Sequence, residues 1–526
     1  RPSGPSARGS AGSACAASPA SPFPRHSWRS SSSLSCRGSG TSKLSSCPCS
    51  GAGSAGGWEP VTPGSASLRK TDRTRPKPKP LVLAVIDGLT PSMLERGLAE
   101  GRLPALGFLA EHGFSARGTT TFPSLTPVCL TSIATGAHPD VHHVPHLVWY
   151  HRGERRLVEY GSSFSAMWAA GARQSLRDSV FNMSHAHVSP QATTVFEALE
   201  DAGYVSGAIT EAAYGPRRFF FFNVFESDET GAPLAVRSRA EGSIDAYAGA
   251  IGRWLVTRDG FDFLVFYLPD YDYASHLAGP DAAVGALERA DRSLGQLMAA
   301  AGGAEGFLER YAIIVCSDHG QTPSERVAQL QDAFTDLRLH TPRRNGDRDR
   351  LDLVVSASNR AGMLYRLPGC TLETRELAER LDEQPAAGVV LFRENGGAVA
   401  RSAGRELRFR SDEGGWGLEG DAAVLDGERY PNGLERAWRA LACPNAGDVI
   451  VSAAEGWEFV DLGGGHHVGG GSHGSLTAGD STVPLLAAGF DASPFPEDPS
   501  ITDLAPLALA HFGVEPPASM APPRGA

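Results

Sequence analysis

Several short segments of this 526-residue chain carry side chains that can bind metal ions. One is Asp318-His319, which follows the apolar run Ala312-Ile313-Ile314-Val315. Asp and His are common zinc ligands, and an apolar run that ends abruptly in a polar turn predicts a buried strand of an α/β sheet. Such sheets bind ligands beyond the carboxyl ends of their strands, so the pair lies where a metal site is expected. The alternative is that the pair only caps the next helix.

Further carboxylates and imidazoles lie beside three other apolar runs: Asp87 after 81–86; Asp270, Asp272 and His276 after 263–268; and His473 before 483–488. Taken singly, each could have a purely structural role. Together they offer more oxygen and nitrogen ligands than one tetrahedral zinc needs, and they suit two metal ions about 4 Å apart. A pair of metal ions stabilises both the attacking and the leaving oxygen of a phosphoryl transfer. The set therefore predicts phosphoryl-transfer chemistry.

A hydroxyl nucleophile for that chemistry is available among four threonines: Thr119, Thr120, Thr121 and Thr126. Thr126 fits the N-cap of a helix predicted over 128–135, with Pro127 at the first helical position. A hydroxyl at a helix N-terminus faces unpaired N–H groups and the positive end of the helix dipole, which stabilise an alkoxide and bind phosphate. This position favours Thr126, and a mere N-cap is the alternative.

The elements that must position these residues alternate along the chain. Strands are predicted at 81–86, 263–268, 312–315 and 483–488, and helices at 91–100, 104–112, 128–135, 191–202, 242–256, 281–300 and 373–384. This alternation predicts an α/β fold whose central sheet is largely parallel, with helices on both faces. Between 321 and 460 the pattern loosens, which predicts a smaller inserted α+β element or cap. The catalytic domain then comprises 79–320 and 461–515.

Charge is distributed unevenly between the two ends of the chain. Residues 1–80 contain twelve Lys or Arg and two acidic residues, whereas the whole chain has a formal net charge of −11, so residues 81–526 carry −21. An acidic globular part does not suit nonspecific binding of nucleic acid, which needs positive charge to displace counterions. It suits an enzyme with several buried carboxylates around cations.

Residues 1–78 are rich in Ser, Gly, Ala and Pro, and this composition predicts a disordered, low-complexity basic tail.

The apolar runs of the chain are far shorter than the roughly 20 residues that span a bilayer. The four cysteines beyond the tail form no disulfide framework and no C-x-x-C zinc site. We therefore expect a soluble protein, with a cytoplasmic location favoured over a secreted one. The oligomeric state is left open.

As an ordered set, these residues resemble the nucleotide pyrophosphatase/phosphodiesterase branch of the alkaline phosphatase superfamily. The resemblance covers about 80–320 and 465–515 and implies an alkaline-phosphatase-like fold. It implies that Asp87, Asp318 and His319 hold one zinc ion and that Asp272, His276 and His473 hold the other. Asp272 is chosen over Asp270 because the family spaces D-x-x-x-H before a G-P pair, which Asp272, His276 and Gly279-Pro280 match. Asp270 is the fallback.

The resemblance also implies Thr126 as the nucleophile and as a further metal ligand. The family places its nucleophile ten residues before the Gly of a T-G pair, here Thr135-Gly136, although Thr121-Phe122-Pro123 matches its T-F-P string. Three residues after the nucleophile many members carry an Asn that binds a phosphate oxygen, whereas this chain has Cys129, a weak donor. Backbone N–H groups at the helix start, or an Asn elsewhere such as Asn359, could substitute.

Other histidines have no ligand position in the family pattern, and we expect loop or supporting roles for them: His138, His142, His143, His146, His466 and His467.

The expected function is hydrolysis of phosphoric (di)esters or pyrophosphate bonds through a phosphothreonine intermediate. We expect two divalent metal ions, Zn²⁺ by expectation, as cofactors and a small-molecule phosphate ester as substrate. The alternatives are a phosphonate or phosphate monoester hydrolase of the same superfamily and a noncatalytic binding protein.

Overall fold

The computed structural model of this protein describes residues 78–209, 243–340, 350–412 and 415–520. These residues belong to one compact unit, Thr74–Ala526. The predicted disordered tail lies outside the described residues except for its final position. Within the described ranges, no helix is long and apolar enough to cross a membrane.

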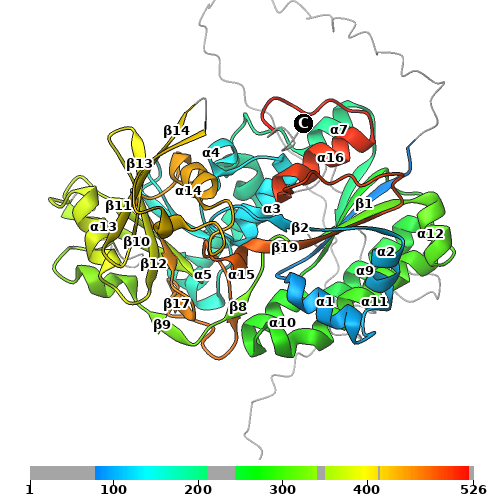
Figure 1. Ribbon diagram of the computed structural model, residues 1–526, viewed down its shortest axis with the longest axis horizontal. Helices are drawn as coiled ribbons and strands as arrows, with labels where there is room; N and C mark the ends of the chain where they lie inside the picture. The colour runs from blue at the N-terminus through cyan, green and yellow to red at the C-terminus, as the bar shows by residue number, and fades with distance from the viewer. Residues whose placement is uncertain (1–77, 210–242, 341–349, 413–414, 521–526) are drawn as a thin grey trace, which may run out of the picture. The chain divides into compact units, whose positions relative to one another are not determined.

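A six-stranded sheet contains the strands that carry the candidate metal ligands (Figure 1). Its order is β2-β19-β7-β1-β6-β5, with bounds β1 Leu81–Ile86, β2 Gly113–Thr119, β5 Ser206–Ile209, β6 Phe263–Leu268, β7 Ala312–Cys316 and β19 Thr482–Ala488. Strands β5, β6, β1 and β7 are parallel to one another, and β19 runs antiparallel to both of its neighbours. The predicted α/β fold with a largely parallel sheet is confirmed, with β19 as the reversed strand.

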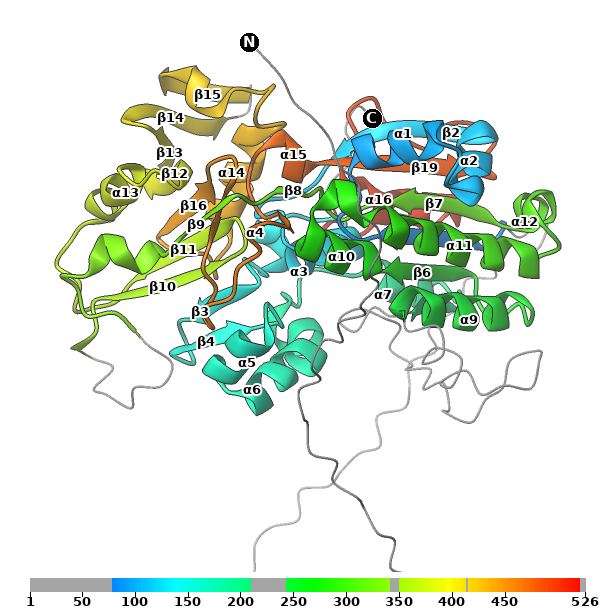
Figure 2. The same cartoon turned by 90° about the horizontal axis from the view of Figure 1, so that it is seen from below.

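Alternate residues of β1 contact helices on opposite faces of the sheet, as side chains of a strand must. Val82, Ala84 and Ile86 pack in one apolar cluster with α1 (Pro91–Ala99), α2 (Pro104–Glu111), α9 (Ile244–Val256), α11 (Val284–Ala300) and α12 (Ala304–Arg310), which Figure 2 shows along one face of the sheet. Leu81, Leu83 and Val85 pack on the other face with α3 (Thr126–Thr135), α7 (Val195–Asp201) and α16 (Leu504–His511). Helices therefore cover both faces, as the sequence predicts.

A second, seven-stranded sheet is built from the region where the alternating pattern loosens. Every strand pair in it is antiparallel, in the order β10 (Leu353–Ser358), β11 (Ala361–Arg366), β16 (Val449–Ala453), β12 (Ala387–Glu394), β13 (Gly397–Ser402), β14 (Arg405–Asp412) and β15 (Gly415–Gly420). Helix α13 (Thr374–Asp382) packs in one apolar cluster with this sheet, and α14 (Gly433–Ala442) packs in another. The exact domain boundaries stay a prediction.

Shorter elements connect these layers, and several of them border the candidate site. They are α4 (Pro139–His142), β3 (Val148–His151), β4 (Arg156–Glu159), α5 (Phe164–Ala170), α6 (Ala172–Arg177), α10 (Asp270–Ala278), β8 (Thr322–Pro323), β9 (Arg326–Ala328), β17 (Trp457–Phe459), β18 (Gly471–Ser472) and α15 (Ala478–Ser481). A π-helix occupies Asp178–His187, and short 3₁₀ helices begin at Pro280, Leu330, Ala422 and Ile501.

The guanidinium of Arg360 ties the second sheet to the segment before β19. Its Nη1 lies 2.8 Å from Oδ1 of Asp480 and also donates to Thr322. Its Nε and Nη2 donate to the backbone oxygens of Trp457 and Ala454 at 3.1 Å. Because a buried charge is stable only when it is paired and hydrogen-bonded, this contact positions the loops of both sheets relative to each other.

Candidate active site

The candidate residues converge at the carboxyl ends of three neighbouring parallel strands. Asp87 directly follows β1, and Asp318 and His319 follow β7. Asp272 and His276 lie on α10, which begins two residues after β6. Because β6, β1 and β7 are adjacent and parallel, their ends lie at one edge of the sheet. His473 follows β18 and reaches the same place from the late part of the chain.

Asp87, Asp318 and His319 form the first group that could hold a metal ion. Their ligand atoms all lie within 4.8 Å of one another, and all three residues are buried. Nε2 of His319 is 3.4 Å from Oδ1 of Asp87 and 3.4 Å from Oδ2 of Asp318. Neither of these carboxylate oxygens has a hydrogen-bond partner within the described residues. Buried carboxylate oxygens without donors are expected to face a cation, so this group fits a divalent metal.

The second group differs in one member from the predicted set. The ligand atoms of Asp272, His319 and His473 lie within 4.8 Å of one another, and the rings of His319 and His473 stack with centroids 3.6 Å apart. His276 lies close by, with Nε2 3.2 Å from Oδ2 of Asp272 and its ring centroid 5.1 Å from that of His473. The role of His276 as a ligand stays a prediction.

Each of the three histidines is oriented by a backbone carbonyl. Nδ1 of His319 lies 3.0 Å from the oxygen of Gly320, that of His276 lies 2.8 Å from Gly471, and that of His473 lies 2.8 Å from Ser124. A carbonyl oxygen only accepts, so Nδ1 carries a proton, and in its neutral form such a ring has its lone pair on Nε2. Histidines that bind metals are typically held in this way by a second hydrogen bond.

The carboxylates also have supporting donors. The Tyr267 hydroxyl donates to Oδ2 of Asp87, and Nε2 of Gln321 donates to Oδ1 of Asp272 over 2.7 Å. The backbone N–H groups of Gly88 and His319 donate to Oδ1 of Asp318 at 3.3 and 3.0 Å. Sequence reasoning missed Tyr267 and Gln321, although both stand within two residues of a strand end or of the Asp-His pair.

The electrostatics of the cluster favour a bound cation. Burial raises the pKa of Asp87, and the carboxylates of Asp318 and Asp272 raise it further. Burial also raises the pKa of Asp318 and lowers the pKa of His473, on which His319 acts in the same direction. Carboxylates crowded in this way repel one another when ionised, and a divalent ion reverses that penalty.

Thr126 presents its hydroxyl to this cluster, with Oγ1 3.1 Å from Nε2 of His319. The prediction of Thr126 as an N-cap is wrong: Leu125 holds that position, and Thr126 is the first residue of α3. Its hydroxyl is not used for capping because it points to His319. Thr120 and Thr121 are fully buried, and their hydroxyls face the thiol of Cys129 at 3.2 and 3.9 Å.

Cys129 and Asn359 are the two residues considered above for binding a phosphate oxygen, and they lie in different surroundings. Cys129 has no exposed surface, and burial raises the pKa of its thiol well above the ordinary value, so it stays a neutral thiol and at most a weak donor. Nδ2 of Asn359, by contrast, lies 3.0 Å from Nε2 of His473. The fallback ligand Asp270 is turned away, since its carboxylate accepts from Ser243 and from the backbone of Asp245 at the start of α9.

The other histidines stand outside both groups of metal-capable residues in the described part of the chain. Nε2 of His142 contacts the hydroxyl of Ser132 at 3.1 Å. Nδ1 of His467 contacts the Glu458 carboxylate at 3.1 Å, and its ring lies 4.0 Å from that of His276. His467 therefore neighbours a candidate ligand without joining the set.

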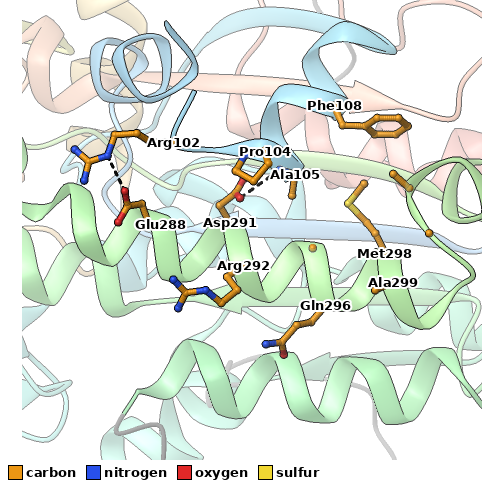
Figure 3. A pocket seen from close by; sticks show the side chains of 13 residues that line it. Arg102, Pro104, Ala105, Phe108, Glu288, Asp291, Arg292, Gln296, Met298 and Ala299 are labelled. Atoms are coloured by element: carbon orange, nitrogen blue, oxygen red, sulfur yellow. Dashed lines mark hydrogen bonds and ion pairs between the residues drawn. The ribbon is translucent and has the colours of Figure 1, made fainter. Parts of the chain in front are cut away.

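A hollow of about 660 Å³ lies between α2 and α11, away from this cluster (Figure 3). Among its lining residues, Nε of Arg102 pairs with Glu288 at 2.6 Å, and Asp291 accepts from the backbone N–H of Ala105 at 3.2 Å. None of its lining residues is a candidate metal ligand. The metal-capable residues therefore lie at the strand ends and not in this hollow.

Comparisons with known proteins show which folds and families this chain resembles. The phosphonoacetate hydrolase of Sinorhizobium meliloti 1021, solved with phosphonoformate and with phosphonoacetate, superposes with a TM-score of 0.53 at 19% identity in both structures, covering 83% of this chain and 97% of that one. This likeness confirms the alkaline-phosphatase-like fold. A 69-residue stretch is 36% identical to the 2,3-bisphosphoglycerate-independent phosphoglycerate mutase of Wolinella succinogenes and spans 13% of each protein.

The family model for type I phosphodiesterase / nucleotide pyrophosphatase matches residues 81–476. This match begins at β1 and extends past His473, so it includes every strand end that carries a candidate ligand. The chain thus belongs to the type I phosphodiesterase / nucleotide pyrophosphatase family and is a hydrolase with the metal-capable site of a phosphoester-cleaving enzyme.

Proposed function

We propose that this hydrolase cleaves phosphodiesters with Thr126 as its nucleophile, at a site for two divalent ions that we expect to be Zn²⁺. The observation that carries the proposal is the 3.1 Å contact between the Thr126 hydroxyl and Nε2 of His319, inside a buried cluster of carboxylates and imidazoles. Asp87, Asp318 and His319 would hold one ion, and Asp272, His276 and His473 the other, with Thr126 as a further ligand.

Bound divalent ions would lower the pKa of the nucleophilic hydroxyl and stabilise the leaving oxygen. In the first step Oγ1 of Thr126 forms a bond to phosphorus, the ester P–O bond breaks, and the hydroxyl proton ends on the released alcohol or in solvent. In the second step the oxygen of a water molecule forms a bond to phosphorus, the P–O bond to Thr126 breaks, and one proton of the water returns to Oγ1 of Thr126. Two in-line displacements predict retention of configuration at phosphorus.

The start of α3 supports this role for Thr126. The backbone N–H of Thr126 has no hydrogen-bond partner among the described residues, and Pro127 carries no N–H. The positive end of a helix attracts anions. An unpaired N–H at the first residue of α3 can therefore donate to an oxygen of the phosphoryl group while the adjacent hydroxyl attacks.

Thr126→Ala tests the nucleophile, and Thr121→Ala is its matched control because Thr121 belongs to the competing T-F-P string. With p-nitrophenyl esters and added zinc, we expect Thr126→Ala to lose at least about a thousandfold in kcat while its metal content, measured by mass spectrometry, is kept. Thr121→Ala should hydrolyse the esters at close to the wild-type rate. Wild-type turnover by Thr126→Ala would refute the assignment.

A second candidate function is hydrolysis of phosphonates, because the phosphonoacetate hydrolase shares this fold. Hydrolysis of a phosphate monoester is a third. Rates on a diester, a monoester and a phosphonate, each with and without a chelator, separate the three, and no turnover of any of them would favour a noncatalytic binding protein. A cytoplasmic location and the absence of nucleic-acid binding stay predictions.

A further inference from the structure

Asn359 reaches the candidate site from the second sheet. It lies between β10 and β11, is only 6% exposed and lies 114 residues before His473 in the sequence. Its Nδ2 is 3.0 Å from Nε2 of His473. Among the described residues, this amide is thus the one polar side-chain group from the second sheet that contacts a candidate metal ligand.

The backbone around Asn359 is held on both sides. Asn359 has a φ of +54°, the left-handed region that Asn tolerates better than most residues. Its carbonyl accepts from the N–H of Phe459 at 2.7 Å, and the next N–H, that of Arg360, donates to the carbonyl of His473 at 2.8 Å. The Arg360 side chain is itself locked by Asp480. This turn is therefore fixed to the segment that carries His473.

The orientation of the amide is also determined. The Ser358 hydroxyl donates to Oδ1 of Asn359 over 3.1 Å, which leaves Nδ2, the donor end, directed at His473. Since Nδ1 of His473 donates to the Ser124 carbonyl, Nε2 carries the only lone pair of that ring. The Asn359 N–H uses this lone pair here.

The same lone pair is the one that His473 would give to a metal ion. It cannot serve both partners, so a metal at Nε2 would leave a buried N–H of Asn359 without this acceptor. A buried donor without an acceptor is costly and is therefore rare. The substrate of the proposed function brings the needed acceptor, an oxygen of its phosphoryl group, for which the buried Cys129 thiol is only a weak donor.

Resting on the proposed function, we propose that Nδ2 of Asn359 donates to a phosphoryl oxygen of the substrate and is a specific binding contact of the loaded site. The amide is neutral, so it neither repels the metal ions nor neutralises the phosphate. It would thereby recognise the oxygen through the geometry of a hydrogen bond and not through charge. The second sheet then contributes directly to substrate binding.

The test is binding of inorganic orthovanadate to the metal-loaded chain by titration calorimetry. Asn359→Gly removes the amide at a φ that glycine adopts freely. Asn395→Gly is the matched control, since Asn395 has a φ of +49° in the β12–β13 turn and does not contact the site. We expect Asn359→Gly to bind orthovanadate about ten- to a hundredfold more weakly, with wild-type metal content, and Asn395→Gly to bind it like wild type.

Equal affinity in Asn359→Gly and wild type would overturn the inference, as would loss of metal from Asn359→Gly, which would make Asn359 a positioning residue for His473. Absence of orthovanadate binding by the loaded wild-type chain would overturn it as well. The readout needs no turnover: weakened binding in a chain that hydrolyses no ester would sustain this contact and reject the proposed function. Ester hydrolysis with unchanged orthovanadate affinity would do the reverse.

Discussion

Gly88 packs directly against Asp272: a Cβ at residue 88 would lie 2.9 Å from Oδ1 of that carboxylate. Gly88 has a φ of +70°, and its N–H donates to Oδ1 of Asp318 at 3.3 Å. One glycine after β1 therefore sits between carboxylates of both candidate metal groups. It allows them to approach because it has no side chain.

Gly88→Ala should weaken metal binding, because the new methyl must displace Asp272. Carboxylate positions that support a metal typically change affinity by about 10- to 100-fold when disturbed, and we expect a loss in that range in a competitive zinc titration. The control is Gly101→Ala, at a φ of +66° with no atom within 4 Å of the added Cβ. It bears the same backbone strain, roughly 1–2 kcal/mol, but should keep the wild-type zinc affinity. Equal zinc affinity in both variants would contradict the prediction.

Asp272 and Asp270 make different contacts, so their substitution should have different effects. Asp272→Asn should lower the bound metal from two ions to one per chain, because its carboxylate faces His276 and His473. Asp270→Asn should keep both ions and instead lower thermal stability, since Asp270 accepts from the N-terminus of α9. Metal content by mass spectrometry and melting by circular dichroism distinguish the two variants. Loss of metal from Asp270→Asn alone would restore the fallback assignment.

Much of the site could be predicted from sequence because β1, β6 and β7 are short, fully buried apolar runs that each end near an Asp. Parallel pairing then brings those ends together. The strands β2 and β5 escaped prediction because Gly113–Thr119 is polar and half-exposed and Ser206–Ile209 has only four residues. Spacing along the chain also does not determine whether His276 or His319 lies nearer to His473, since that depends on side-chain packing.

Asp245 leads to a pH prediction. Burial raises its pKa to about 8, with a further contribution from Asp270, and its Oδ2 has no hydrogen-bond partner within the described residues. Between about pH 4, the pKa of a free Asp, and pH 8, the folded chain keeps a proton on this group that the unfolded chain releases. The free energy of unfolding should therefore fall as the pH rises through this window.

Asp245→Asn removes that proton exchange, so the variant should lose less stability between pH 5 and pH 8 than the wild type does. Urea unfolding at a series of pH values measures the difference. Asp281→Asn, at an exposed carboxylate, is the control and should follow the wild-type pH profile. Parallel profiles for wild type and Asp245→Asn would show that the Asp245 carboxyl ionises equally in both states.

The buried pair of Arg360 and Asp480 predicts a large cost for removing one partner. Both side chains are almost fully buried, so Arg360→Met leaves an uncompensated carboxylate and should destabilise the fold by about 3–5 kcal/mol in urea unfolding. Arg380→Met is the control: its pair with Asp336 is largely exposed and should contribute less than about 1 kcal/mol. The double variant Arg360→Met/Asp480→Asn should lose less than the sum of its single variants, because the orphaned charge is gone. Additive losses would show that the two groups do not stabilise each other, and Arg360 would then contribute only through Thr322 and its backbone acceptors.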